Sequence, residues 1–297
     1  MTPAPPAEVS RIVYLGTPDL AVTPLVALHQ AGYEIPVVVS RPDARRGRGR
    51  GTEPSPVKRT ATELGLEVAD DLDGLMSVQA DIGVVVAYGH IIPTTLLDHL
   101  AFINIHFSLL PRWRGAAPVE RAILAGDSHT GVCLMEVTEE LDTGAVYRRA
   151  EVEIGPDETL DELRGRLVEI GTTQLIGALA EGLGEPVAQK GTPVYALKIT
   201  STDREIDWSE PASVIHRQVR VGGAFTTFRG RRFKIHHTRL VAEYPIPLQP
   251  GEIHHVAAGT GAGVLLLVEV QPEGKPTQPA HAWLNGARPT ADDRFGR

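Results

Sequence analysis

Two polar residues stand two positions apart at the end of an apolar run, in the stretch "FINIHFSLLP" at 102–111. Successive side chains of a strand point to opposite faces, so Asn104 and His106 share one face. An Asn amide donates hydrogen bonds, and a His ring can donate, act as an acid or act as a base. Two such donors suit an oxyanion that forms at a carbonyl carbon. A polar strand end that bonds only within the protein is the structural alternative.

A carboxylate completes a possible catalytic set. Asp142 lies in "EELDTGAVY" at 139–147, in a predicted loop between two strand-like runs. If it contacts His106, it would fix the tautomer of the ring and favour its protonated form. The set has no nucleophilic Ser or Cys beside it. Asn104, His106 and Asp142 therefore indicate direct transfer of an acyl group to an amine that is itself the nucleophile.

Other common site chemistries are missing from the sequence. The first predicted turn after a strand, "LGTPD" at 15–19, lacks the glycine pattern of dinucleotide-binding folds, and no phosphate-binding Gly-x4-Gly-Lys motif is present. Cys133 is the only cysteine, and we expect a buried, unreactive side chain. No residues have metal-ligand spacing, and the adjacent pairs His236–His237 and His254–His255 are predicted to lie on the surface. We therefore expect no metal.

The first half of the chain alternates predicted strands and helices. Proline follows a capping residue at Thr17-Pro18 and Ser55-Pro56, which predicts two helix starts. The succession predicts an α/β fold: a Rossmann-like, doubly wound, mostly parallel sheet, which binds ligands at the carboxyl ends of its strands. The strands are predicted at 11–15, 34–40, 81–89, 101–105 and 131–137, and further helices at 117–127 and 159–182.

The remainder of the chain changes character. Residues 183–203 lose helical periodicity and gain Pro, Gly, Ser and Thr, as in a linker. Short β-rich runs follow, punctuated by Gly and Pro, which predict a small OB-like β-barrel. We expect a catalytic domain at 8–183, a linker at 184–204 and a C-terminal domain at 205–297.

The net charge of −8 conceals two basic segments. Residues 41–50 hold five arginines and one aspartate, and 217–239 hold seven Lys/Arg and no acid. Such an uneven distribution suggests a localised polyanion site, although basic runs can also be solvated loops. The apolar runs are too short to cross a bilayer, and the start of the chain lacks the pattern of a secretory signal. We therefore expect a cytoplasmic monomer without membrane contact.

Several motifs together resemble one enzyme family. "NIHFSLLPRWRGAAP" (104–118) followed by "ELDTG" (140–144) is similar to the formyltransferases that use 10-formyltetrahydrofolate. The resemblance extends to "GTPD" (16–19), "PSPVK" (54–58), "VVVAYGHIIP" (84–93), "IDW" (206–208) and "WLNG" (283–286), and so covers nearly the whole chain. "RWRGAAP" and the C-terminal β-rich domain favour the branch of the family that formylates methionyl-tRNA.

The resemblance implies roles for individual residues. Asn104, His106 and Asp142 match the catalytic trio. Other residues match the folate-contacting turn and the backbone wall beside the pterin ring: Ser108, Leu109, Leu110 and Pro111, and Ala87, Tyr88, Gly89 and Ile92. The basic residues match regions that contact tRNA: Arg41, Arg45, Arg46, Arg48 and Arg50 in the first segment, and Arg229, Arg231, Arg232 and Lys234 in the second.

The implied reaction uses 10-formyltetrahydrofolate as co-substrate and initiator methionyl-tRNA as partner. The α-amine attacks the formyl carbon, Asn104 and protonated His106 stabilise the oxyanion, and Asp142 orients His106 and helps to remove the proton.

Two alternatives stay open. A family member that formylates another amine, such as a nucleotide amino sugar or a hydroxyornithine, is favoured by "VRVGGAFTTF" at 219–228, where the tRNA enzymes usually have a proline-rich segment. A non-catalytic tRNA- or folate-binding module would be favoured if a member of the trio were replaced, and all three are present.

Overall fold

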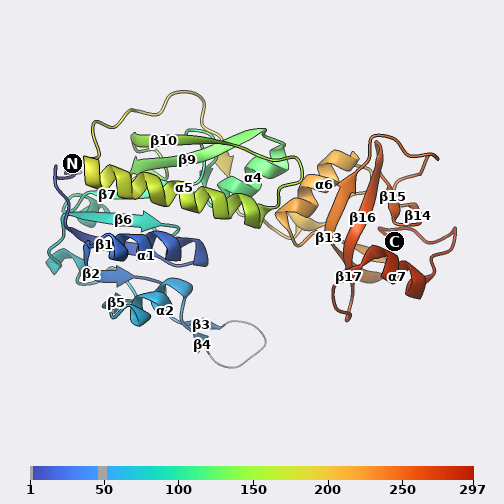
Figure 1. Cartoon of the computed structure of the whole chain (residues 1–297), viewed down its shortest axis with the longest axis horizontal. Coiled ribbons are helices and arrows are strands. Elements are labelled where there is room, and N and C mark those ends of the chain that lie inside the picture. Colours follow the sequence, from blue (N-terminus) through green and yellow to red (C-terminus); the bar gives the residue numbers. More distant parts are fainter. Residues whose placement is uncertain (1–2, 46–51) are drawn as a thin grey trace. The chain divides into compact units, whose positions relative to one another are not determined.

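The computed structural model describes residues 3–45 and 52–297, so the predicted tRNA-binding residues Arg46, Arg48 and Arg50 lie outside the described residues. The chain forms two compact units. The first unit consists of the residues up to Pro118 together with His129–Glu153 and Arg164–Leu197, and the second of Val119–Ser128, Ile154–Leu163 and Lys198–Arg297. Figure 1 shows the elements of both units in the colours of the sequence.

A seven-stranded sheet forms the centre of the first unit, in the order β10-β9-β7-β6-β1-β2-β5. The strands are β1 (Arg11–Gly16), β2 (Glu34–Val39), β5 (Val68–Ala69), β6 (Ile82–Val86), β7 (Phe102–His106), β9 (His129–Glu136) and β10 (Val146–Glu153). The residues of β6 are all buried, as their unbroken Ile/Val content predicts. Two-stranded pairs accompany this sheet: β3 (Ala44–Arg45) with β4 (Thr52–Glu53), and β8 (Arg114–Gly115) with β11 (Tyr195–Ala196).

The sheet is mostly parallel, and the predicted fold class is confirmed. Strands β5, β2, β1, β6 and β7 run parallel to one another, whereas β9 is antiparallel to β7 and to β10. The succession of strands and helices predicted a mostly parallel sheet with a strand at 131–137, whose direction it did not assign. Apolar content and length do not distinguish a parallel buried strand from an antiparallel one, so the reversal at β9 left no signal in the sequence.

The helices of residues 19–181 begin largely where the sequence indicates. They are α1 (Val22–Gln30), α2 (Pro56–Glu63), the short α3 (Thr94–Leu97), α4 (Pro118–Ala125) and α5 (Leu160–Glu181), with 3-10 turns η1 (Asp19–Ala21) and η2 (Leu75–Ser77). Ser55 caps α2 by accepting a hydrogen bond from the Lys58 N–H, as predicted. The Thr17 cap was wrong, because η1 precedes α1 and the Thr17 hydroxyl donates instead to the Tyr88 carbonyl.

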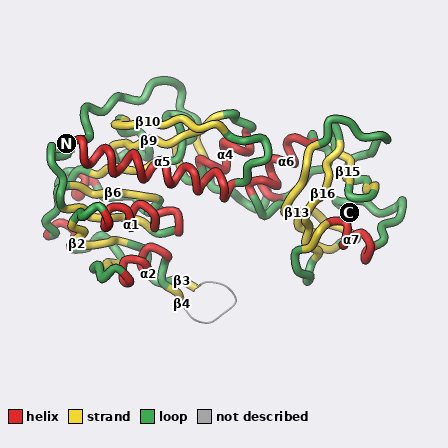
Figure 2. Tube along the Cα trace, viewed as in Figure 1, coloured by secondary structure: helices red, strands yellow, loops and turns green. Residues whose placement is uncertain are grey.

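The second unit is built on an antiparallel sheet in the order β12-β13-β16-β15-β14, with β17 beside β16. Its elements after the 3-10 turn η3 (Thr202–Arg204) are α6 (Ala212–Val221), β12 (Phe225–Phe228), β13 (Arg231–Leu240), β14 (Ile253–His254), β15 (Ala257–Gly259), β16 (Val264–Pro272), β17 (Gln278–Pro279) and α7 (Ala280–Ala287). Figure 2 distinguishes these strands from α6 and α7, which the sequence analysis did not predict. Aromatic residues fill the core, where Phe233 and Trp283 pack with ring centroids 4.8 Å apart.

The C-terminal segment joins the two ends of this sheet. Phe295 bridges Phe228 of β12, and Arg294 bridges Glu252 next to β14. The Gly296 N–H donates to the Thr227 carbonyl, and the Phe295 N–H donates to the Gly251 carbonyl. These bonds give the sheet the barrel-like closure expected of an OB-like domain.

Two segments that precede the predicted linker belong to the second unit. Arg217 of α6 donates to the Leu124 carbonyl near the end of α4, and Arg220 donates to the Glu158 and Gly155 carbonyls. Arg121 of α4 forms a bidentate pair with Asp203. The division between the units at Leu197–Lys198 lies inside the predicted linker 184–204, whose boundaries remain a prediction.

No helix among the described residues combines the length and apolar character needed to cross a membrane.

Candidate active site

Strand β7 carries Asn104 and His106 at its carboxyl end. Its backbone is fixed on both sides, because Asn104 lies opposite Val85 of β6 and Met135 of β9, and His106 lies opposite Cys133. The two side chains share one face of the sheet, as alternation predicts. The Asn104 amide is half-buried and forms no hydrogen bond with the described residues. It is therefore available to a ligand.

The His106 ring is buried and held by two oxygen atoms. Nε2 lies 2.9 Å from the Trp113 carbonyl oxygen. A carbonyl only accepts, so Nε2 carries the proton and Nδ1 is the basic nitrogen of the neutral ring. Nδ1 faces Asp142 Oδ2 across 3.7 Å, with 6% of the His side chain and 11% of the Asp side chain exposed. That gap is too long for a hydrogen bond, so Nδ1 can still bond to a substrate atom.

The loop between β9 and β10 presents Asp142 from an unusual backbone conformation. Its φ is 54°, in the left-handed region that Asp tolerates better than most residues. The Gly115 N–H donates to Asp142 Oδ2 at 2.7 Å and aims the carboxylate at His106. Two residues later, a Cβ on Gly144 would lie 2.1 Å from the Glu136 carbonyl oxygen, so only glycine fits. In the sequence "DTG", Asp142 thus provides the carboxylate that faces His106, and Gly144 allows the loop to approach the Glu136 backbone closely.

The turn after β7 offers few side chains to a ligand. Ser108 and Leu110 are fully buried, and the Ser108 hydroxyl donates to the Arg112 carbonyl at 2.6 Å. The Leu110 carbonyl accepts a hydrogen bond from Arg149, and the bond from Leu110 to Pro111 is cis. Leu109 is half-buried and packs near Gly131. A folate contact from Ser108 or Leu110 would have to come from the backbone.

The segment after β6 exposes its backbone at the same edge of the sheet. Ala87 and Gly89 are exposed and have positive φ values of 46° and 78°. Ile91 is 83% exposed, whereas Tyr88 and Ile92 are buried in the core. Burial raises the pKa of Tyr88. An exposed backbone segment close in sequence to an exposed apolar side chain suits a flat heterocycle with donor and acceptor groups on its edge.

The Arg-rich segment 41–50 begins beside this exposed backbone. Arg41 donates to the Gly89 carbonyl at 2.8 Å. Arg45 lies in β3, which pairs with β4 and so forms the stem of the segment. Lys58 bonds to Asp43 and Asp70 at 2.8 Å each and fastens this stem to α2. The predicted tRNA contact Arg41 therefore reaches the predicted folate wall.

The basic residues of the C-terminal sheet differ in their partners; we call Arg229, Arg231, Arg232 and Lys234 the C-terminal basic cluster. Arg229 forms a bidentate pair with Asp293 at 2.8 and 2.6 Å. Arg231 lies 3.8 Å from Glu273, and Arg232 stacks 3.8 Å above the Phe225 ring. Lys234 has no acidic partner among the described residues. The sequence analysis grouped all four.

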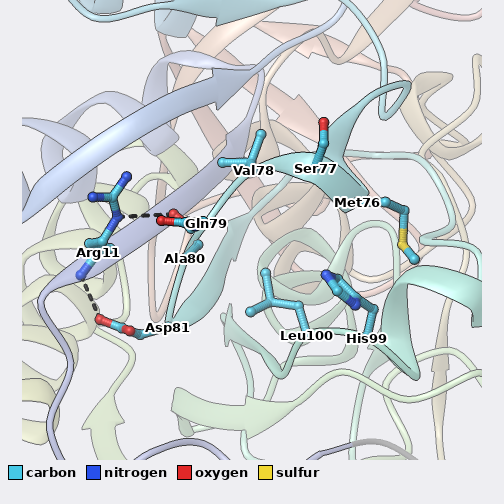
Figure 3. Close-up of a pocket in the computed structure, with 9 residues that line it drawn as sticks. All are labelled: Arg11, Met76, Ser77, Val78, Gln79, Ala80, Asp81, His99 and Leu100. Carbon is cyan, nitrogen blue, oxygen red and sulfur yellow. Dashed lines mark hydrogen bonds between the residues drawn. The ribbon is translucent and has the colours of Figure 1, made fainter.

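Two other features of the described part of the chain are a buried thiol and a hollow. Cys133 is fully buried, and burial raises the pKa of its thiol, as expected for a structural residue. The described residues contain no cluster of His, Cys, Asp or Glu suited to a metal ion. A hollow of about 460 Å³ lies at the amino ends of β1, β6 and β7, opposite the edge that carries His106. Figure 3 shows that its Arg11 is already bonded to Gln79 and Asp81.

The sequence analysis missed two residues beside the trio. Arg114 and Gln189 bond to one another, and Gln189 donates to the backbone of the Asp142 loop. Arg114 stands inside the motif "RWRGAAP", which could have drawn attention to it. Gln189 lies in the predicted linker and had no such signal.

Comparison with known proteins gives the same family for both parts of the chain. Residues 10–179 match the model of the formyl transferase family, and 198–288 match that of the formyl transferase C-terminal domain. The methionyl-tRNA formyltransferase of Heliobacterium modesticaldum is 41% identical over 96% of this chain and 100% of its own length. That of Thermobifida fusca is 40% identical over 96% of this chain and 99% of its own.

Solved structures agree in fold. WlaRD, a sugar 3N-formyl transferase crystallised with dTDP and 5-N-formyl-THF, superposes with a TM-score of 0.66 at 16% identity, over 91% of this chain and all of its own. HypX from Aquifex aeolicus in complex with tetrahydrofolic acid gives a TM-score of 0.65 at 17% identity, over 92% of this chain and 46% of its own.

Proposed function

The chain belongs to the formyl transferase family, and from this premise we propose that it transfers the formyl group of 10-formyltetrahydrofolate to the α-amine of methionyl-initiator tRNA. The observation that carries the proposal is the position of Asn104, His106 and Asp142 at the carboxyl end of β7, within a chain of which 96% is similar to methionyl-tRNA formyltransferases. Such an acceptor implies a cytoplasmic enzyme, which we propose acts as a monomer.

The transfer begins when the amine nitrogen attacks the formyl carbon. The carbonyl oxygen then becomes an oxyanion, which requires donors that are fixed before the reaction starts. The Asn104 amide has this role in the proposal, supported by its half-buried position and its lack of a partner among the described residues. Protonated His106 is the second donor, through Nδ1. The bond between carbon and folate N10 breaks as the amide bond forms.

The attacking amine must lose a proton, and folate N10 must gain one. Asp142 faces His106 Nδ1 from 3.7 Å and is itself held by the Gly115 N–H. This arrangement places a carboxylate beside the ring and gives the departing proton a route through His106 or the Asp142 carboxylate. Because the amine is the nucleophile, the mechanism requires no covalent intermediate with the enzyme.

The folate would bind between the wall at 87–92 and the turn at 108–111. The positive φ values of Ala87 and Gly89 and the exposed Ile91 support binding of the pterin through backbone edges and an apolar face. Ser108, Leu109, Leu110 and Pro111 would shape the opposite side of the site. For tRNA, the proposed contacts are the Arg41–Arg50 segment and the C-terminal basic cluster, which would bind phosphates.

The reaction itself provides the test. The purified protein is incubated with 10-formyltetrahydrofolate and charged initiator tRNA, and formyl-methionyl-tRNA is separated from methionyl-tRNA. We expect product from the intact chain and product reduced by about 10²–10⁴ in turnover from His106→Ala. No product from the intact chain would contradict the proposal.

A second candidate acceptor is a nucleotide-linked amino sugar. It is favoured by the fold shared with WlaRD, a sugar 3N-formyl transferase, and by the segment "VRVGGAFTTF", which lacks prolines. The same assay with a dTDP-linked amino sugar separates the two. Formylation of the sugar without formylation of methionyl-tRNA would show that the acceptor of this chain is a nucleotide-linked amino sugar.

A further inference from the structure

A closed ring of hydrogen bonds joins the two loops that meet at His106. Arg114 donates from Nε and Nη2 to Gln189 Oε1, at 3.0 and 2.6 Å. Gln189 Nε2 donates to the carbonyls of Asp142 and Gly144, at 2.9 and 2.8 Å. Gly115, the next residue after Arg114, donates its N–H to Asp142 Oδ2. The ring therefore holds Asp142 at two points, its side-chain carboxylate and its backbone carbonyl.

The orientation of the Gln189 amide is fixed by its partners. A guanidinium only donates and a carbonyl only accepts, so the amide oxygen must face Arg114 and the amide nitrogen must face the loop. Both N–H groups and both lone pairs of the oxygen are in use. No other side chain of similar length both accepts two hydrogen bonds and donates two. Glutamate, the closest in shape, would oppose two carbonyl oxygens with a carboxylate.

The segment that carries Gln189 is fastened at both ends to the same two loops. Val187 exchanges two backbone hydrogen bonds of 2.9 Å with Val146, which follows the Asp142 loop. Val194 bonds to Pro111 and Arg114, and Tyr195 and Ala196 form β11, which pairs with Arg114 and Gly115 of β8. Residues 185–197 therefore span the site, and Gln189 occupies the middle of the span.

From this ring we infer that Gln189 is a positioning residue for formyl transfer, which acts by holding the Asp142 loop at the distance from His106 that the reaction needs. The Asp142 backbone is left-handed and makes few other long-range bonds, so the two carbonyl contacts restrain where the carboxylate points. Displacing a catalytic group by about 1 Å can cost about 10²-fold in rate. The inference rests on the proposed function for its substrates and on the ring for its geometry.

Two substitutions separate the loop contacts from the arginine contact. Gln189→Met keeps the length of the side chain and removes both kinds of bond, whereas Gln189→Glu keeps the bond to Arg114 and removes both donors to the loop. We expect each to lower kcat for formyl-methionyl-tRNA by about tenfold or more, with KM for folate and tRNA changed less than about twofold. Wild-type kcat in Gln189→Glu would overturn the inference.

A matched control comes from the second unit. Gln218 Nε2 also donates to two backbone carbonyls, those of Asp203 and Glu205, at 2.8 and 2.9 Å. Gln218→Met should leave kcat within about twofold of the intact chain, although it removes the same kind of anchor. An equal loss in both variants would mean that such anchors act through overall stability, and would overturn the inference.

The role through Asp142 is tested by a double-mutant cycle. In an Asp142→Asn background, adding Gln189→Met should lower kcat by less than about twofold, because there is no carboxylate left to position. A loss as large as in the intact background would make the two effects independent and overturn the inference.

Hydrogen exchange gives a readout that needs no substrate. The peptide 138–146 should exchange faster in Gln189→Met and Gln189→Glu than in the intact chain, and unchanged exchange would overturn the inference. If the intact chain makes no formyl-methionyl-tRNA, the proposed function fails by itself, and this exchange experiment decides the inference alone.

Discussion

The two proposed binding regions differ in how much of their polar capacity the protein itself uses. At the proposed catalytic trio, the Asn104 amide bonds to none of the described residues, and His106 Nδ1 lies 3.7 Å from Asp142. In the C-terminal basic cluster, Arg229 is paired with Asp293 and Arg232 covers the Phe225 ring. A group already bonded within the protein must give up that bond to meet a ligand. The comparison indicates that motif and spacing locate usable groups better than charge does.

The largest expected effect comes from replacing, one at a time, a histidine at each edge of the first sheet. His106→Ala removes a ring that is buried and bonded at the carboxyl edge, and turnover should fall by about 10²–10⁴. His99→Ala removes an exposed ring at the opposite edge, beside the hollow in Figure 3, and turnover should not change. Rates of formyl-methionyl-tRNA formation under saturating substrates measure both. Similar losses in the two variants would show that position on the sheet does not decide the role.

Asn104 tests whether an unbonded amide marks the oxyanion site. Asn104→Ala should lower kcat by about 10²–10³, the usual effect of removing one oxyanion donor. Because the amide supports no described neighbour, the midpoint of thermal unfolding should stay close to that of the intact chain. Asn285→Ala, in the exposed face of α7, is the control. A large drop in unfolding temperature with Asn104→Ala would assign the residue to structure instead.

Whether a feature could be predicted from the sequence depended on whether it follows local rules or contacts between distant segments. Asn104, His106 and Asp142 could be located because strand alternation and the "LDTG" motif are local rules that survive folding. The direction of β9 and the role of Gln189 could not, since both depend on which segments meet in space. Residues 185–197 have the composition of a linker because they bond mainly through backbone groups, which leave no trace in residue type.

Within the C-terminal basic cluster, the comparison predicts that one cation matters more for tRNA than its neighbour. Lys234→Ala should weaken tRNA binding and lower the slope of log affinity against log salt by about 1, as for one lost phosphate contact. Arg229→Ala should change that slope less, because Asp293 already neutralises the guanidinium and holds it in place. Filter binding across a salt series measures both. The reverse order would show that tRNA displaces Asp293.

The smallest expected effect concerns an ion pair within the second unit, between Arg121 and Asp203. Arg121 of α4 donates to Asp203, and this bond lowers the pKa of the Asp203 carboxyl from its ordinary value of 3.8 to about 2. The pKa is lower in the folded chain, so the pair contributes stability above about pH 4 and loses it as the pH falls toward 2. Asp203→Asn should therefore cost about 1 kcal/mol of unfolding free energy at pH 7, a value reduced for solvent screening.

Urea unfolding of the intact chain and of Asp203→Asn at pH 7 and near pH 3 checks both the sign and the location of this effect. The difference in unfolding free energy between the two proteins should narrow at the lower pH, because the Asp203 carboxyl is then mostly protonated in the unfolded chain, with its ordinary pKa of 3.8, but still mostly charged in the folded chain. Asp207→Asn serves as the control for a carboxyl whose pKa is lowered without an arginine, since the Asp207 side chain bonds, among the described residues, only to Ser209 in the loop before α6. A difference in unfolding free energy that stays constant with pH would mean that the charge of Asp203 does not contribute to its interaction with Arg121. The contact between residues 119–128 and the turn at 202–204 would then depend on the backbone and on packing alone.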